Sequence, residues 1–122
     1  LGDQAEPQKL VTLIAEESAK PENIGTLIFF VVMAVAVAPV AEEILFRGIL
    51  YPAVKQLGHP RVAVIGTALL FALFHVNLLT FASLTAVALS LIALYEFTDN
   101  LLAPITAHAV FNASNLIMLL WQ

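Results

Sequence analysis

The sequence predicts an all-α integral membrane protein, a bundle of about four membrane helices of which one is long and kinked by proline. The first observation is composition: 61% of the 122 residues are hydrophobic, whereas ordinary soluble domains are roughly 45–50% apolar. The second is a mean hydropathy of +0.94, which a chain this short cannot bury in a water-soluble core. The third is Pro39, which removes a backbone donor inside an apolar run and clashes with the carbonyl of Val35.

The chain is expected to divide into an aqueous or interfacial segment, residues 1–23, and a membrane-embedded core, residues 24–122. Within the first segment, residues 7–20 are predicted to form a short amphipathic helix. Pro7 suits its first turn and Pro21 ends it. Because the sequence begins without Met, we expect it to be the core of a longer protein.

The core contains four apolar runs. Residues 24–41 are eighteen uncharged positions, near the minimum for a membrane span. The helix that they start is expected to continue to about Leu57, before Gly58 and Pro60. The other runs are residues 61–79, 82–95 and 101–121. The run over 82–95 is short for a full crossing, and the polar stretch EFTDN after it is expected to be a loop.

Composition also excludes several classes of function. The chain has no cysteine, so it forms no disulfides and no thiolate metal sites. It has no basic patch, so we expect no nucleic-acid partner. The positive-inside rule gives no orientation, because lysine and arginine are evenly distributed on the two sides.

Three charges interrupt the first helix in the stretch VAVAPVAEEILFRG, residues 35–48. A charge inside a membrane helix costs roughly 2.5–3.5 kcal/mol and usually faces the protein interior. Glu43 and Arg47 are four residues apart, so they share a face and are expected to pair. Glu42 is rotated by about 100° from its neighbour and has no local partner, which suits a general base. The alternative is that all three form a structural polar cluster at a helix end.

Two histidines lie in the later apolar runs. His75 is expected deep in the second run, with Phe71 four residues earlier on the same face. His108 begins a stripe on the last helix that continues with Asn112 and Asn115. Each of these polar groups would cost free energy if it faced lipid. We therefore expect them to converge with the unpaired glutamate on one site within the membrane.

These residues form an ordered set: Glu42-Glu43-x-x-x-Arg47, Phe71-x-x-x-His75 and His108-x-x-x-Asn112. The set, together with the stretch EEILFRG, resembles the CPBP family of CAAX prenyl endopeptidases and bacteriocin-processing enzymes, also called Abi proteins. The resemblance runs from about Ile24 to Leu120, and it implies peptide-bond hydrolysis within the membrane. The active-site residues that it implies are Glu42, His75, His108 and Asn112. We expect Glu43, Arg47, Phe71 and Asn115 to support them.

Two chemistries fit the implied site. In the first, which needs no metal, Glu42 and His75 take the proton from water, and His108 and Asn112 stabilise the oxyanion. In the second, Zn²⁺ is bound by His75, His108 and Glu42, because a catalytic zinc normally takes three protein ligands. Glu43 would then be the only nearby base, so ligand counting favours the metal-free site.

Three functions remain open. The first is an intramembrane endopeptidase that acts on a membrane-associated or prenylated protein or on a peptide precursor. The second is a catalytically silent immunity or scaffold protein of the same family. The third is a proton-coupled carrier, which is disfavoured because the sequence has no paired repeats. The expected partners are membrane lipid and a membrane-associated protein or peptide substrate, and the expected location is the cell membrane.

Overall fold

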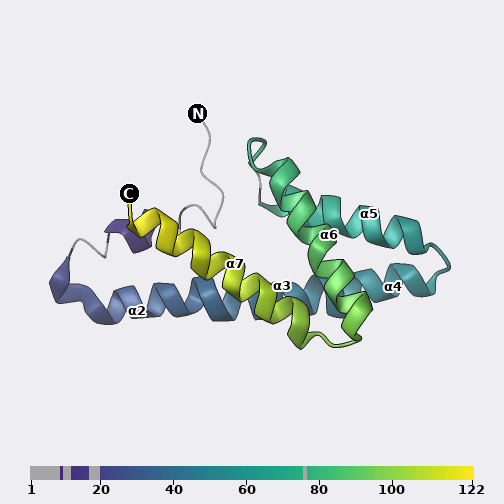
Figure 1. Ribbon diagram of the computed structural model, residues 1–122, viewed down its shortest axis with the longest axis horizontal. Coiled ribbons are helices and arrows are strands. Elements are labelled where there is room, and N and C mark those ends of the chain that lie inside the picture. Colours follow the sequence, from purple (N-terminus) through teal and green to yellow (C-terminus); the bar gives the residue numbers. More distant parts are fainter. Residues whose placement is uncertain (1–8, 10–11, 17–19, 76) are drawn as a thin grey trace.

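The computed structural model describes residues 9, 12–16, 20–75 and 77–122. Every regular element in this part of the chain is a helix, so the predicted all-α class is confirmed. One continuous helical rod, Ile24–Gln56, runs the length of the molecule, and the later helices pack against it (Figure 1). Its end at Gln56 agrees with the end near Leu57 that the sequence predicts.

The rod consists of segments with two hydrogen-bond registers. The α-helical segments are α2 (Ile24–Val32), α3 (Ala38–Glu43) and α4 (Tyr51–Gln56). The π-helical turns between them are η2 (Met33–Val37) and η3 (Ile44–Leu50). A 3₁₀ turn, η1 (Pro21–Asn23), precedes the rod.

Each π-helical turn stands directly before a proline: Pro39 is the second residue after η2, and Pro52 is the second residue after η3. At the end of η2, the N–H of Ala38 donates to the carbonyl of Met33, five residues back instead of four. The wider turn gives space to a proline ring that would otherwise clash with the carbonyl four residues earlier. The rod therefore continues through Pro39, the proline at which the sequence predicts a kink.

The remaining helices cover the two halves of the rod. Helix α5 (Pro60–Phe74) returns along α4 and packs on α6 (Phe81–Thr98), whereas α7 (Leu102–Leu120) contacts η2, α3 and α6. Figure 1 shows α5 and α6 beside the α4 end of the rod and α7 beside its η2 and α3 part. The segment that carries the two glutamates thus lies where the two groups of helices meet.

Helix α5 ends earlier than the apolar run predicts. It stops at Phe74, and the chain turns before α6 begins at Phe81, although the run continues to residue 79. The side-chain oxygen of Asn77 accepts a hydrogen bond from the N–H of Leu79 at 3.0 Å. Such a turn gives the backbone an alternative to the helix. His75 therefore lies at the end of a helix, and not deep within a span.

Helix α6 is longer than the apolar run over 82–95. It continues through Glu96 and Thr98, so the first three residues of EFTDN are helical. The hydroxyl of Thr98 donates to the carbonyl of Leu94 at 2.7 Å, and the helix ends where Asp99 adopts a positive φ of 49°. A polar end of a helix is not visible in hydropathy alone, which explains the difference.

Within the described residues, three helices are long and apolar enough to cross a membrane: Ile24–Gln56, Phe81–Thr98 and Leu102–Leu120. Helix α5, with 15 residues, is the shorter apolar helix, so the short member of the four expected helices is the second and not the third. Many large apolar side chains on all four are exposed. Such a surface is stable in lipid and not in water.

The predicted helix over residues 7–20 lies partly outside the described residues. Residue 9 and residues 12–16 are helical, and Ile14 is buried.

Candidate active site

Glu43 and Arg47 form a buried ion pair at the centre of the rod, as their spacing predicts. Nη1 of Arg47 donates to Oε1 of Glu43 at 3.1 Å, and both side chains are 0% exposed. Nη2 of Arg47 donates to the backbone carbonyl of Ala88 in α6 at 3.1 Å. Oε2 of Glu43 and Nε of Arg47 are buried without a hydrogen-bond partner in the described structure. The pair is therefore only partly satisfied, which makes it sensitive to any further loss of a partner.

His108 of α7 lies between the two glutamates of α3. Its Nδ1–H donates to Oε1 of Glu43 at 2.7 Å, and its Nε2 lies 3.3 Å from Oε2 of Glu42. The imidazole is 4% exposed and the side chain of Glu42 is 28% exposed. Glu42 is thus the most exposed member of this group.

The two contacts of His108 require that one proton lies between its Nε2 and the carboxylate of Glu42. Because Nδ1 carries its hydrogen toward Glu43, neutral Nε2 has only a lone pair, and so does an ionised Glu42. Two acceptors at 3.3 Å repel each other unless one of them carries a proton. Glu42 and His108 therefore share a proton, either as an ion pair or as a neutral pair. This arrangement leaves the cluster without net charge, because Arg47 balances Glu43, and avoids the cost of burying an excess charge.

His75 ends α5 and stands beside the same cluster. Its Nδ1–H donates to the carbonyl of Phe71 at 2.8 Å, so the neutral ring keeps a free lone pair on Nε2. The imidazole is half-buried and interacts electrostatically with Glu42. His75 thus lies within electrostatic range of the exposed carboxylate, whereas the histidine that touches this carboxylate is His108.

The ring of Phe71 lies among the charged and imidazole groups. Its centroid is 4.7 Å from the His75 ring and 5.8 Å from the His108 ring. The guanidinium carbon of Arg47 lies 4.7 Å from the same centroid, within range of a cation–π interaction. Phe71 therefore packs on His75, as the sequence predicts, and also joins α5 to the buried pair.

Asn112 of α7 reaches the rod at a backbone group that has no partner within its own helix. Its Nδ2 donates to the carbonyl of Ala34 at 2.9 Å. In an α-helix this carbonyl would accept from Ala38, but that N–H donates to Met33 across the π-helical turn. The next possible donor is Pro39, which has no N–H. The side-chain amide of Asn112 therefore replaces the missing backbone donor, and its second N–H remains for another acceptor.

Asn115 does not join the cluster. It lies on the same helix as His108 and Asn112, but its side chain is exposed whereas His108 is buried. The expected stripe on this helix thus reaches the site with two members. Three contacts of the site were not predicted from the sequence: His108 with Glu43, Arg47 with Ala88, and Asn112 with Ala34. Each joins residues far apart in the chain, and no local pattern reports such contacts.

The nitrogen and oxygen donors of the site are not arranged as metal ligands. Within the described part of the chain, no group of three or more His, Cys, Asp or Glu residues is placed to hold a metal ion. Both ring nitrogens of His108 face glutamates, and Nδ1 of His75 is used by a backbone carbonyl. The set His75, His108 and Glu42 therefore does not present zinc-ligand geometry in this conformation.

The fold and the cluster define a class: helical membrane proteins with a cluster of glutamate, arginine and histidine side chains between their helices. The chain matches the family described as Type II CAAX prenyl endopeptidase Rce1-like over residues 24–114, about three quarters of its length. It belongs to that family, which agrees with the resemblance seen in the motifs, and it is an integral membrane protein. No curated protein and no solved structure matched the chain.

Proposed function

We propose that this chain is an intramembrane endopeptidase that hydrolyses a peptide bond of a membrane-associated or prenylated protein or peptide precursor. The observation that carries the proposal is His108 held between Glu42 and Glu43, at 3.3 and 2.7 Å. A carboxylate that shares a proton with a histidine is a general acid–base unit. Membership of a family described as prenyl endopeptidases supports peptide-bond hydrolysis as the reaction of this unit.

In the proposed reaction, Glu42 takes a proton from a water molecule. Its side chain is the exposed member of the pair, and the free Nε2 of His75 can accept the second hydrogen of that water. The water oxygen then bonds to the peptide carbonyl carbon. The proton passes from Glu42 to the leaving nitrogen as the C–N bond breaks, so the carboxylate acts first as base and then as acid.

The oxyanion that forms on the carbonyl needs hydrogen-bond donors. Nε2 of His108, once protonated, is one donor. The second N–H of Asn112 is another, because the first is used by Ala34. Glu43 and Arg47 act through His108: Glu43 keeps Nδ1 in its donating tautomer, and Arg47 balances the charge of Glu43.

The substrate is expected to approach from the membrane, and the proposed location is the cell membrane. The outer surface of the helices is rich in exposed apolar side chains, so lipid surrounds the site and a prenyl group can reach it by lateral diffusion. A prenylated C-terminal sequence is the family's eukaryotic substrate, whereas a bacterial member would process a peptide precursor.

The test is peptide cleavage by the chain reconstituted in vesicles. The substrates are a peptide with a prenylated CAAX terminus and the same peptide without the prenyl group. Glu42→Gln should lower the cleavage rate by about 10²- to 10⁴-fold, the contribution of a general base. Glu22→Gln is the matched control, because Glu22 is an exposed carboxylate of the N-terminal segment, and it should cleave like wild type.

Two further measurements decide between the alternatives. Activity that a zinc chelator removes and added Zn²⁺ restores would favour the zinc site over the metal-free chemistry. Cleavage by Glu42→Gln at the wild-type rate would exclude the proposed base. A folded wild-type chain that cleaves neither of the CAAX peptides nor a set of peptide precursors would instead favour the silent immunity or scaffold protein.

A further inference from the structure

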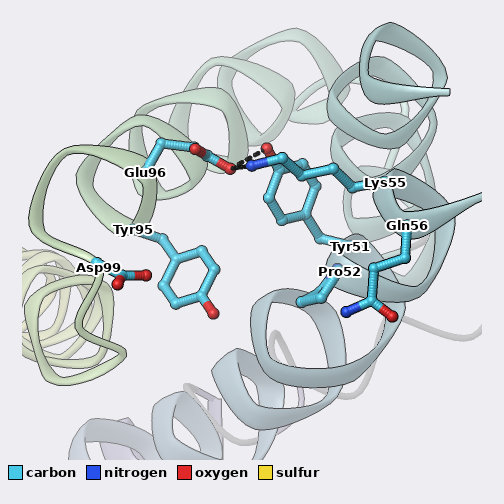
Figure 2. Close-up of a pocket in the computed structure, with 7 residues that line it drawn as sticks. All are labelled: Tyr51, Pro52, Lys55, Gln56, Tyr95, Glu96 and Asp99. Atoms are coloured by element: carbon cyan, nitrogen blue, oxygen red, sulfur yellow. Dashed lines mark hydrogen bonds and ion pairs between the residues drawn. The ribbon is translucent and has the colours of Figure 1, made fainter. Parts of the chain in front are cut away.

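A second polar site lies at the far end of the rod from η2, between α4 and α6. It is a cavity of about 400 Å³, within the range of small-ligand pockets, and its lining residues are Tyr51, Pro52, Lys55, Gln56, Tyr95, Glu96 and Asp99. Figure 2 shows the α4 side chains on one side of the cavity and the α6 side chains on the other. None of the residues assigned to the candidate active site lines it.

The cavity lies at the aqueous boundary of the membrane. The rod has 33 residues and is about 50 Å long at 1.5 Å per residue, whereas the hydrocarbon core is about 30 Å thick. One or both ends of the rod must therefore leave the hydrocarbon. The cavity is formed where α4 and α6 end, at Gln56 and Thr98, and it contains two tyrosines and a lysine, residues typical of this boundary.

A hydrogen-bond network makes the wall of the cavity rigid. Tyr51, which is 2% exposed, donates its hydroxyl hydrogen to Oε1 of Glu96 at 2.5 Å. Lys55 donates to the same oxygen at 2.5 Å, as Figure 2 shows. The ring of Tyr51 also packs edge-to-face on Tyr95, with centroids 6.3 Å apart. The side chains of α4 and α6 thus hold one another in place before any ligand binds.

This network leaves specific groups unused. Among the described residues, Oε2 of Glu96 and the carboxylate of Asp99 have no partner, and Lys55 keeps two of its three N–H donors. The lining carries one positive and two negative side chains. It therefore offers donors for one anionic group and a larger number of acceptors for a cationic group.

We propose that this cavity binds the headgroup of a zwitterionic phospholipid with a primary amine, the phosphate at Lys55 and the ammonium between Glu96 and Asp99. The two parts of such a headgroup match the two kinds of unused groups. The acyl chains would leave the cavity along the apolar exterior, where Leu94 and Phe97 are exposed. The inference is independent of the proteolytic function.

The chemistry of the cavity selects among headgroups. A primary ammonium donates three hydrogen bonds, which the unpaired carboxylates can accept, whereas a quaternary ammonium donates none. A quaternary ammonium prefers aromatic faces, but the Tyr51 face is already approached by Nζ of Lys55 at 5.7 Å. An anionic headgroup without an amine would leave the carboxylates unpaired beside its own negative charge.

The experiment is lipid competition on the full chain. The protein is extracted from vesicles that contain equal amounts of phosphatidylethanolamine, phosphatidylcholine and phosphatidylglycerol, and retained lipid is identified by native mass spectrometry. We expect phosphatidylethanolamine to be retained over the other two by about tenfold, the effect of one charge-assisted hydrogen bond. Asp99→Asn and Glu96→Gln should each reduce that preference by about tenfold, so that the three lipids are retained almost equally. Glu22→Gln should leave the preference unchanged.

Asp99→Asn keeps the test valid if Glu96→Gln disturbs the network. Asp99 has no partner to lose, and asparagine tolerates the left-handed backbone that this position adopts. A competition with water-soluble glycerophosphoethanolamine tests whether the ligand is a lipid or a free phosphate ester. This soluble headgroup should not displace the lipid at equal concentration. Equal retention of the three lipids, retention unaffected by Asp99→Asn, or displacement by the soluble headgroup would each overturn the proposal.

Discussion

Two carboxylate–cation pairs in the described part of the chain, Glu43–Arg47 and Lys55–Glu96, differ in burial. Glu43 and Arg47 pair at 3.1 Å with both side chains 0% exposed. Lys55 and Glu96 pair at 2.5 Å, but their side chains are 45% and 40% exposed. Water screens the second pair, so its net contribution to stability is small. The first pair has given up its hydration, so each partner depends on the other.

The difference also separates two uses of charge. At the buried pair, Glu43 holds a histidine in one tautomer, which is useful only if the pair does not move. At the exposed pair, the unused oxygen of Glu96 and the unused donors of Lys55 remain available to a ligand. Burial thus suits a group that positions another residue, and partial exposure suits a group that binds.

Breaking the buried pair should have the largest effect on stability. Arg47→Ala leaves Glu43 as an uncompensated buried carboxylate, and the free energy of unfolding should fall by about 3–5 kcal/mol. The measurement is denaturant titration in mild-detergent micelles, followed by circular dichroism. Arg61→Ala is the control, because Arg61 is exposed, and its change should stay within about 0.5 kcal/mol. Equal stability of the two variants would contradict the comparison.

Removing both buried charges should cost less than removing one. In Glu43→Leu/Arg47→Met neither charge of the pair is left unpaired. The remaining losses are the acceptor of His108 Nδ1, about 1–3 kcal/mol, and the donor to the Ala88 carbonyl. The same titration measures them beside Arg47→Ala. If Glu43 positions His108, the double variant should not cleave peptides, even though it is more stable than Arg47→Ala. Recovered cleavage would show that the pair is structural only.

At the exposed site, the tyrosine hydroxyl should matter moderately. Tyr51→Phe removes the donor to Glu96 while the ring contact with Tyr95 remains. We expect a loss of about 1 kcal/mol, typical of one hydrogen bond, because water replaces part of it at the exposed carboxylate. Thermal unfolding of the two proteins in the same detergent would detect it. A loss as large as that of Arg47→Ala would mean that the cavity wall is more buried than its exposure indicates.

The exposed ion pair itself should have the smallest effect. Lys55→Gln removes the charge, and the expected change lies within about 0–1 kcal/mol, as for other surface pairs. The difference between the variant and wild type should become smaller at about 1 M salt, where the Debye length is about 3 Å. Unfolding measured at low and high salt checks both points, and a difference that does not fall with salt would contradict the assignment of this pair as solvent-screened.

The same two pairs show what the sequence could predict. Glu43 and Arg47 are four residues apart on one helix, so helical periodicity alone predicted their contact. Lys55 and Glu96 are 41 residues apart, and their contact depends on how α4 and α6 pack. The contact between His108 and Glu43 spans 65 residues and was missed for the same reason, although both residues had been singled out.

Helix boundaries follow a similar division. The long first helix was predicted to within one residue at its end, because its apolar run is followed by glycine and proline. The ends of α5 and α6 were misjudged, because they depend on Asn77 and Asp99, polar residues whose turns interrupt or extend an apolar pattern. The asparagine was a signal available in the sequence. The π-helical turns left no comparable signal apart from the prolines that follow them.

Those two turns have a consequence for how helical faces are counted along the chain. A π-helical turn acts like a one-residue insertion into an α-helix, and one residue corresponds to a rotation of about 100°. The residues before η2, between η2 and η3, and after η3 therefore belong to three different helical wheels. Deleting one residue from η2 would rotate α2, which has no buried residue, relative to the glutamates. The same deletion in η3 would turn Tyr51 and Lys55 away from α6. The fold should therefore tolerate a one-residue deletion less well in η3 than in η2.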